Sequence, residues 1–278
     1  MKEKTKKTSV GDEPIYDARA LGKARMFVLG FQHVFAMFGA TVLVPTITGL
    51  SVSNTLLFAG LGTLLFHLLT KGKVPAFLGS SFAFLAAYGL VSANGSEIPI
   101  SYSSFGVVCA GLVYVVVAAL IKGFGAKRVL KFVPPIVTGP IIIAIGLSLS
   151  GWAFSSCADN WWIALIAVVT IIICNIWGRG MSKIIPILIG VIVSYGVAAI
   201  CYGAGMDTLN PESVQAIIDA KWIGLPIVWE DTALYVFKDF DASTLVTAVI
   251  TIVPLAIATI VEHIGDISAI SSTTGINY

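Results

Sequence analysis

The chain has 278 residues, of which 57% are hydrophobic and only 12% are charged, with a formal net charge of +2. Soluble domains carry about 25% charged residues, so this composition excludes a water-soluble globular protein and indicates a polytopic membrane protein. The small net charge gives no reason to expect a nucleic-acid partner.

Residues 1–25 are polar and mostly basic, and they lack the apolar core and cleavage site of a signal peptide. We expect them to form a cytoplasmic tail. Eight apolar segments follow, long enough or nearly so to cross a bilayer as helices of about 20 residues: 26–45, 54–70, 75–91, 102–121, 133–150, 159–177, 184–203 and 243–270. They lack the alternation of outer-membrane strands, so we predict an all-α protein with about eight transmembrane spans.

The basic residues predict the orientation of these spans. With the N-terminus inside, all but two of the 17 lysines and arginines fall on the cytoplasmic side, the exceptions being Lys221 and Lys238. Cytoplasmic loops carry such an excess of basic residues. We therefore expect a multi-pass protein of a cytoplasmic membrane with its N-terminus in the cytoplasm.

Two apolar segments contain residues that interrupt helices. The third holds Pro75, Gly79, Ser80 and Ser81 within seven residues, and the fifth begins with a cluster of prolines at 134–140. Proline removes a backbone donor, and irregular backbone is tolerated at membrane depth only where it is buried in protein or lines a cavity. We predict a break in the third span, since broken spans form substrate sites in transporters.

The longest connection, residues 204–242, is rich in acidic and aromatic residues and falls on the outer side. We expect a hairpin or short helix at the membrane surface, without a binding role. The four cysteines are far apart and form no metal-binding spacing. We therefore predict no metal and no cofactor.

The eighth segment contains Glu262, His263 and Asp266 after a long stretch without charge. A charge at the bilayer centre costs about 2.5–3.5 kcal/mol, so these carboxylates need water, partners or protons. Glu262 and Asp266 share one helix face. Two positions remain open for these carboxylates, at the inner boundary of the membrane or near its middle. Asp266 could lie at the inner boundary. Glu262 would be roughly 28 Å along a helix that begins at Ser243, so it lies near the middle only if that helix is long and tilted.

The first segment carries one ionisable group, His33, next to Gln32. Such a pair often makes a hydrogen bond between helices. A role in a substrate site is the alternative, and the local sequence does not decide between them.

Several stretches resemble bacterial uracil permeases of the nucleobase–ascorbate transporter family. They occur in the order found in that family, from about residue 25 to the end: QHVFAMFGATVLVP (32–45), GKVPAFLGSSFAF (72–84), PPIVTGPIIIAIGL (134–147), IIPILIGVIVSYG (184–196), AKWIGLP (220–226) and VEHIGDISAIS (261–271).

The resemblance implies a fold of fourteen spans in two inverted seven-span repeats, with broken third and tenth spans. On that map the chain holds the first repeat and the first span of the second. Residues 26–121 would be core-domain spans 1–4, residues 122–203 gate-domain spans 5–7, residues 204–242 an extracytoplasmic loop, and residues 243–278 the eighth span. Family members are often dimeric, so a homodimer is a further expectation.

The resemblance also assigns site residues. Glu262 matches the family's eighth-span carboxylate that binds the nucleobase, and Phe82, beside Ser81, matches the third-span residue that contacts it. His33 matches a first-span histidine near the site. Asp266 matches a position held by histidine or aspartate in different members, and so leaves the choice between uracil and xanthine open.

The expected function is proton-coupled uracil import, with Glu262 and Asp266 as the proton-coupling residues. A protonated carboxyl group presents a donor beside an acceptor, which matches the N–H/C=O edge of uracil, and a carboxyl group away from water holds its proton more readily.

Three alternatives accompany this expectation. One is a xanthine or other purine permease, and another is a fragment that does not transport alone, because the chain stops just after the eighth segment. The third, a membrane enzyme, is disfavoured since no motif such as HExxH or GxSxG is present.

Overall fold

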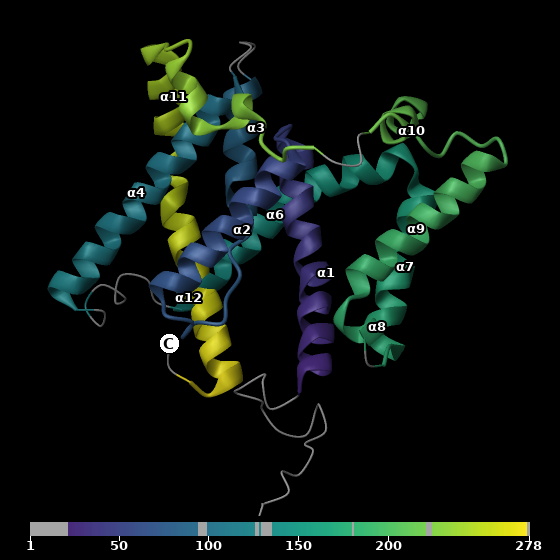
Figure 1. Ribbon diagram of the computed structural model, residues 1–278, viewed down its shortest axis with the longest axis horizontal. Helices are drawn as coiled ribbons and strands as arrows, with labels where there is room; N and C mark the ends of the chain where they lie inside the picture. The colour runs from purple at the N-terminus through teal and green to yellow at the C-terminus, as the bar shows by residue number, and fades with distance from the viewer. Residues whose placement is uncertain are drawn as a thin grey trace, which may run out of the picture. The chain divides into compact units, whose positions relative to one another are not determined.

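The computed structural model describes residues 22–93, 99–125, 128, 135–179, 181–220 and 224–276. Within these ranges all regular structure is helical, and no strand is found (Figure 1). Six of the described helices are long and apolar enough to cross a membrane. The protein is therefore an all-helical, polytopic membrane protein. Most of the expected cytoplasmic tail lies outside the described residues.

The long helices coincide with the predicted apolar segments. Their bounds are α1 (Lys23–Thr48), α2 (Val52–Leu69), α4 (Ile100–Phe124), α6 (Pro135–Asp159), α7 (Trp161–Trp177) and α9 (Pro186–Gly203). All but α7 are among the six candidate spans, and α7, with 17 residues, is a shorter apolar helix.

The predicted break in the third segment is present. Residues 75–81 are not helical, and the chain becomes helical only at η2 (Phe82–Phe84) and α3 (Leu85–Ala93). Ser81 ends the extended stretch, because its hydroxyl accepts a hydrogen bond from the backbone N–H of Ala83 at 3.3 Å.

A threonine of α2 anchors the extended stretch. The Thr63 hydroxyl accepts a hydrogen bond from the Leu78 N–H at 3.1 Å and lies 3.2 Å from the Leu78 carbonyl oxygen, to which it can donate. It also lies 2.8 Å from the Ala59 carbonyl oxygen within its own helix. Thr63 thus provides side-chain partners for backbone groups that have no helical partners.

The fifth segment differs from the expectation of an interrupted span. From Pro135 onward it forms one helix, α6, which continues through Pro140. A proline at the first helical position removes no helical hydrogen bond, because that N–H has no partner within the helix. Pro134 lies outside the described residues.

The eighth segment contains an interruption that we did not predict. It forms α11 (Ala242–Ile252) and α12 (Leu255–Thr274), which are separated at Val253 and Pro254. Proline cannot donate the backbone hydrogen bond that a continuous helix needs. The apolar stretch extends over Ala242–Thr274, so Glu262 lies inside α12 and away from both ends of the stretch.

Asp241 begins α11 as its N-cap, and its carboxylate accepts hydrogen bonds from the Thr244 hydroxyl and from the backbone N–H groups of Thr244 and Ser243. These bonds, the Thr244 hydroxyl first, hold the pKa of Asp241 below its usual value.

The chain divides into two compact units. Of the described residues, those within 22–39, 161–209 and 269–276 form the first, and those within 40–160 and 210–268 form the second. In the first unit α7 packs closely on α9, because Gly190 has no side chain: a Cβ there would lie 2.6 Å from Ile171 and 3.2 Å from the Ala167 carbonyl oxygen. The short helix α8 (Met181–Ile184) precedes α9.

The second unit has a small buried core in which α4 and α11 make a similar contact. A Cβ on Gly106 would lie 2.8 Å from Ile252 and 3.2 Å from the Ala248 carbonyl oxygen. The core residues are Ala87, Val91, Tyr102, Ala110, Val236, Ala248, Ile252 and Ala256.

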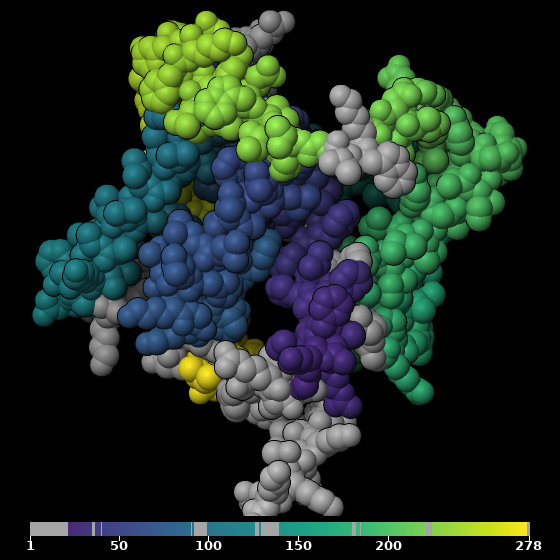
Figure 2. Space-filling view, in the orientation of Figure 1, coloured from purple at the N-terminus to yellow at the C-terminus, as the bar shows by residue number. Residues whose placement is uncertain are grey.

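Much of the apolar surface faces outward, as expected for helices in lipid. On α2 (blue in Figure 2) the exposed side chains include Leu61, Leu64, Leu65, Leu68 and Leu69.

The long connection contains the short helices α10 (Pro211–Ile218), η4 (Trp229–Asp231) and η5 (Ala233–Phe237). Two contacts hold its second half against α4. Val236 is buried, and the Tyr102 hydroxyl donates to the Asp239 carbonyl at 2.6 Å and accepts from the Asp241 N–H at 2.9 Å.

Candidate substrate site

A hydrogen bond joins the end of the extended stretch to α12. The Ser81 hydroxyl donates to Oε2 of Glu262 at 3.3 Å. Glu262 is half-buried in a helix that is otherwise largely apolar. The break in the third segment thus places a polar side chain against the carboxyl group that the sequence singled out.

Next to this pair, a tyrosine of α4 contacts the histidine that follows Glu262. The Tyr114 hydroxyl and Nδ1 of His263 are 2.8 Å apart, and the two rings meet edge to face with centroids 5.6 Å apart. Thr259, one turn before His263, is buried, and its hydroxyl donates to the Ala256 carbonyl of its own helix at 3.0 Å. α4 and α12 therefore carry a polar cluster at one level.

These side chains border a cavity of about 330 Å³, which we call the Ser81 cavity. Its walls come from α1, α2, the extended stretch, η2, α3, α4 and α12. The lining residues are Val44, Leu50, Thr55, Gly79, Ser80, Ser81, Phe84, Tyr88, Val107, Gly111, Tyr114, Thr259 and His263. Glu262 is not among them and reaches the wall through its hydrogen bond to Ser81.

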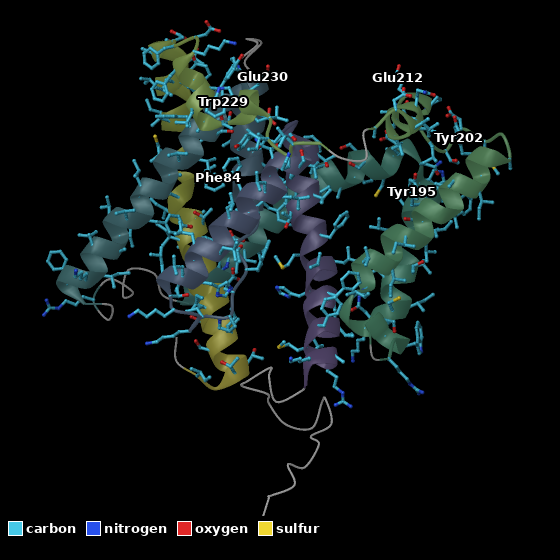
Figure 3. The ribbon with its side chains drawn as sticks, in the orientation of Figure 1. Phe84, Tyr195, Tyr202, Glu212, Trp229 and Glu230 are labelled. Carbon is cyan, nitrogen blue, oxygen red and sulfur yellow. The ribbon has the colours of Figure 1, made fainter. Side chains whose placement is uncertain are left out.

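The other predicted residues of this unit lie differently. Phe82 is half-buried and outside the lining of the cavity, whereas Phe84, labelled in Figure 3, is part of it. The difference follows from the turn of η2, which points residues two apart in different directions. Asp266 is exposed on α12, one turn beyond Glu262, and also lies outside the lining.

His33 is exposed on the N-terminal part of α1, which belongs to the first unit. Its place in a site with Glu262 stays a prediction.

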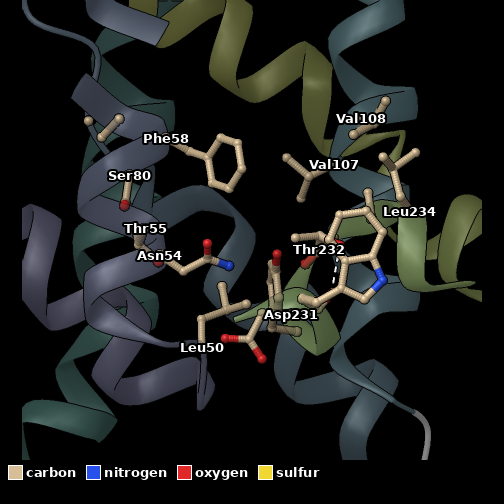
Figure 4. Close-up of a pocket in the computed structure, with 16 residues that line it drawn as sticks. Leu50, Asn54, Thr55, Phe58, Ser80, Val107, Val108, Asp231, Thr232 and Leu234 are labelled. Carbon is tan, nitrogen blue, oxygen red and sulfur yellow. Dashed lines mark hydrogen bonds between the residues drawn. The ribbon is translucent and has the colours of Figure 1, made fainter. Parts of the chain in front are cut away.

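A second, larger space of about 490 Å³ adjoins the first, and we call it the Trp229 cavity. The two spaces share the lining residues Leu50, Thr55, Gly79, Ser80, Tyr88 and Val107. The rest of the Trp229 cavity is lined by parts of α2 and α4 and by the segment Trp229–Leu234 (Figure 4).

Two hydrogen bonds fasten this segment to the beginning of α2. The Asp231 carboxylate accepts the backbone N–H of Ser51 at 2.7 Å, and the Asn54 amide nitrogen donates to the Val228 carbonyl at 3.1 Å. A carboxylate is favourable at a helix N-terminus, where backbone N–H groups lack partners. The connection that we expected to have no binding role therefore forms part of a cavity wall.

Within the described residues, no group of three or more His, Cys, Asp or Glu side chains could hold a metal ion. The four cysteines are unpaired.

Sequence reasoning singled out His263 together with Glu262 and Asp266, but it did not assign Tyr114 and Thr259 to the site. His263 and Thr259 carried a local signal, because they lie beside Glu262 and one turn before it on the same helix. Tyr114 carried none, since its partner is 149 positions away in the sequence.

Comparison of the sequence with known proteins identifies the family of this chain. The xanthine/uracil permease model, described as a permease family, matches residues 24–277. The chain is 40% identical over 256 residues to the uracil permease of Bacillus caldolyticus and 37% identical over 257 residues to that of Bacillus subtilis. It is also 34% identical over 282 residues to the putative pyrimidine permease RutG of Escherichia coli.

These alignments cover 89%, 88% and 98% of the chain but only 56%, 55% and 60% of the three relatives. The chain thus spans little more than half the length of the curated relatives that it matches.

Proposed function

The chain belongs to the xanthine/uracil permease family, and we propose that its gene product transports uracil across a bacterial cytoplasmic membrane. One observation carries the proposal: the hydrogen bond that joins Ser81 to Glu262 beside a cavity, in a chain that is 40% identical to a uracil permease. Members of a permease family move their substrates, so we propose a transporter and not an enzyme.

The Ser81 cavity fits a small, flat and uncharged substrate. Its lining contains the hydroxyl groups of Ser80, Ser81 and Tyr114 and the imidazole of His263, together with apolar side chains. Binding pockets commonly combine an apolar lining with a few placed polar groups. The two flat faces of a nucleobase can pack on the apolar lining, and its ring N–H and C=O groups can bond the polar side chains.

We assign substrate binding to Glu262, which would exchange its hydrogen bond with Ser81 for hydrogen bonds with the substrate. Ser81 engages Oε2 and not Oε1, and a protonated carboxyl group pairs a donor with an acceptor. The side chain therefore matches the N–H/C=O edge of uracil once the substrate replaces Ser81 as its partner. The backbone of Phe82, the first residue of η2, is the proposed second contact.

Proton coupling follows from the same group. An ionised carboxylate in an apolar span costs about 2.5–3.5 kcal/mol, so we assign the coupled proton to Glu262. Asp266, one turn away and exposed, is the proposed group that exchanges this proton with water. His33 completes the proposed site from the first span.

The proposed layout keeps eight spans with a cytoplasmic N-terminus. Residues 26–121 and 243–278 form the core domain, residues 122–203 the gate domain, and residues 204–242 an extracytoplasmic loop. Residues 161–209 fall into a different compact unit from α2, α3, α4 and α11, which supports this division, but α6 falls into the unit of those core helices and the start of α1 falls with residues 161–209. Inverted repeats and a homodimer belong to the same proposal.

The test is uptake of labelled uracil by cells that lack their own uracil permease and express the complete gene that encodes this chain. We expect uptake that collapses with the proton gradient and that excess unlabelled uracil blocks far more strongly than excess xanthine. Stronger inhibition by xanthine would assign a purine substrate, and absence of uptake by correctly inserted protein would contradict the proposal.

A further inference from the structure

The Trp229 cavity has the features of a binding site of its own. It is larger than the Ser81 cavity, at about 490 Å³, and three aromatic residues line it, namely Phe58, Tyr88 and Trp229. Its polar lining comes from Asn54, Thr55, Ser80, Ser104, Asp231 and Thr232. Aromatic surfaces with a few fixed polar groups are typical of small-molecule sites.

One polar atom in its wall lacks a partner. Asn54 is only 5% exposed, and its amide nitrogen is fixed by the bond to Val228. Its amide oxygen is buried without a hydrogen bond among the described residues. A buried acceptor left unpaired destabilises the protein, so this oxygen favours a ligand that brings a donor. Figure 4 shows Asn54, Phe58 and Thr232 around the space.

The charges of the lining restrict the ligand. It contains the carboxylate of Asp231 and no basic side chain, so an anion such as a nucleotide is disfavoured. The unpaired acceptor of Asn54 favours N–H donors, and Phe58 and Trp229 favour a flat ring. These requirements together describe an uncharged planar heterocycle with ring N–H groups.

The position of the cavity connects it to the proposed transport site. Thr55, Ser80 and Tyr88 belong to both linings, and Ser80 immediately precedes Ser81. Tyr88 is buried at this junction. A ligand in the Trp229 cavity therefore lies next to the Ser81 cavity without occupying it.

We propose that the Trp229 cavity is a second binding site for uncharged planar heterocycles with ring N–H groups, which the substrate occupies before it reaches Ser81 and Glu262. The choice of uracil as the ligand rests on the proposed function. The site itself rests on the cavity, its aromatic lining and the unpaired Asn54 oxygen.

The experiment measures uracil binding when the inner site is disabled. The complete gene product with Glu262→Ala, which has neither the donor nor the acceptor of residue 262, is purified, and its tryptophan fluorescence is titrated with uracil. The same titration of Glu262→Ala/Trp229→Phe gives the part of the signal that comes from Trp229. We expect saturable quenching in the first protein and its loss in the second.

Two further variants change the proposed binding site but keep Trp229, whose fluorescence reports binding. Phe58→Ala removes a flat surface, and because Phe58 is about half exposed its truncation leaves the core intact. Asn54→Leu removes the unpaired acceptor. In the Glu262→Ala background each should weaken uracil binding, read from the quenching, by up to about tenfold, as loss of roughly 1.4 kcal/mol implies. Leu61→Ala, an exposed residue of α2 outside both linings, is the matched control.

Absence of Trp229-dependent quenching, or equal quenching in Phe58→Ala and the Leu61→Ala control, would overturn the inference. Uracil uptake by the wild-type protein is measured in parallel. Uptake without quenching refutes this second site and leaves the proposed function in place, whereas quenching without uptake refutes the proposed function and supports the site.

Discussion

The α7–α9 pair and the broken third segment show two ways of packing apolar sequence. α7 and α9 contain no charged residue and are joined at Gly190, where the backbones approach closely. The stretch 75–81 is not helical, is anchored by Thr63 and ends at Ser81 beside Glu262. In the described parts of the two regions, the polar side chains of the candidate site lie at the non-helical stretch and not at the contact between α7 and α9.

The difference has a physical reason. A continuous helix satisfies its own backbone groups and needs only shape complementarity with its neighbour. An extended stretch leaves backbone groups that side chains of other elements must satisfy, and so it draws polar residues such as Thr63 and Ser81 into the same place. Substitutions in each region should therefore fail in different ways.

The largest effect should come from filling the close contact of the first unit. Gly190→Val places side-chain atoms against Ile171 and the Ala167 carbonyl, and overpacking of this kind costs about 1–3 kcal/mol. We expect a lower melting temperature of the purified protein and less inserted protein, with the uracil KM of the surviving protein unchanged. A Cβ at Gly196 on the same helix would meet no atom within 4 Å, so Gly196→Val should melt like the wild type.

Thr63→Val should weaken the anchor of the extended stretch. The variant keeps the shape of the side chain but leaves the Leu78 N–H without its partner, at about 1–3 kcal/mol. We expect a higher uracil KM together with a lower melting temperature. Thr170→Val on α7 is the control, because the Thr170 hydroxyl bonds only the Ile166 carbonyl of its own helix. Equal effects in the two variants would contradict the anchoring role.

Ser81→Ala should act on both substrate binding and stability. It removes the hydrogen bond to Glu262, worth about 0.5–1.5 kcal/mol, and should change the uracil KM by up to about tenfold. It also removes the acceptor of the Ala83 N–H at the start of η2, so we expect a lower melting temperature as well. Ser268→Ala is the control, because this exposed serine on α12 bonds the Ile264 carbonyl of its own helix. A wild-type KM in Ser81→Ala would show that the pair does not contribute to substrate binding.

The smallest effect concerns the start of α11. The pKa of Asp241 is lowered by the Thr244 hydroxyl and by two backbone N–H groups, so its stabilisation is present above its unfolded pKa of about 3.9 and is lost as pH falls through the lowered folded value. Asp241→Asn keeps a capping side chain and should remove this loss. Melting temperatures of both proteins between about pH 3 and about pH 6 give the comparison, and parallel curves would contradict it.

Sequence reasoning succeeded where the signal was local. Long apolar runs predicted the helices, and the cluster from Pro75 to Ser81 predicted the break, because proline, glycine and serine each disfavour a helix there. Pro254 carried the same kind of signal, and the separation of α11 from α12 was missed because we read residues 243–270 as one helix.

The remaining features depend on partners that are distant in the sequence. Ser51 bonds Asp231, 180 positions away, and Tyr114 meets His263 across 149 positions. No local pattern specifies such pairs, since each residue alone is ordinary for its helix or loop. The same holds for Phe84, which lines the Ser81 cavity and carried no signal in the sequence, whereas the role of Phe82 stays a prediction.

The most direct test of the account is gradient-dependent uracil accumulation by Glu262→Gln in the complete gene product, at matched membrane levels. Glutamine keeps the size of the side chain but cannot carry the proton, so we predict that accumulation is abolished. Glu212→Gln on the exposed helix α10 should accumulate uracil like the wild type. Wild-type accumulation by Glu262→Gln would contradict the assignment of Glu262 as the shared substrate and proton site.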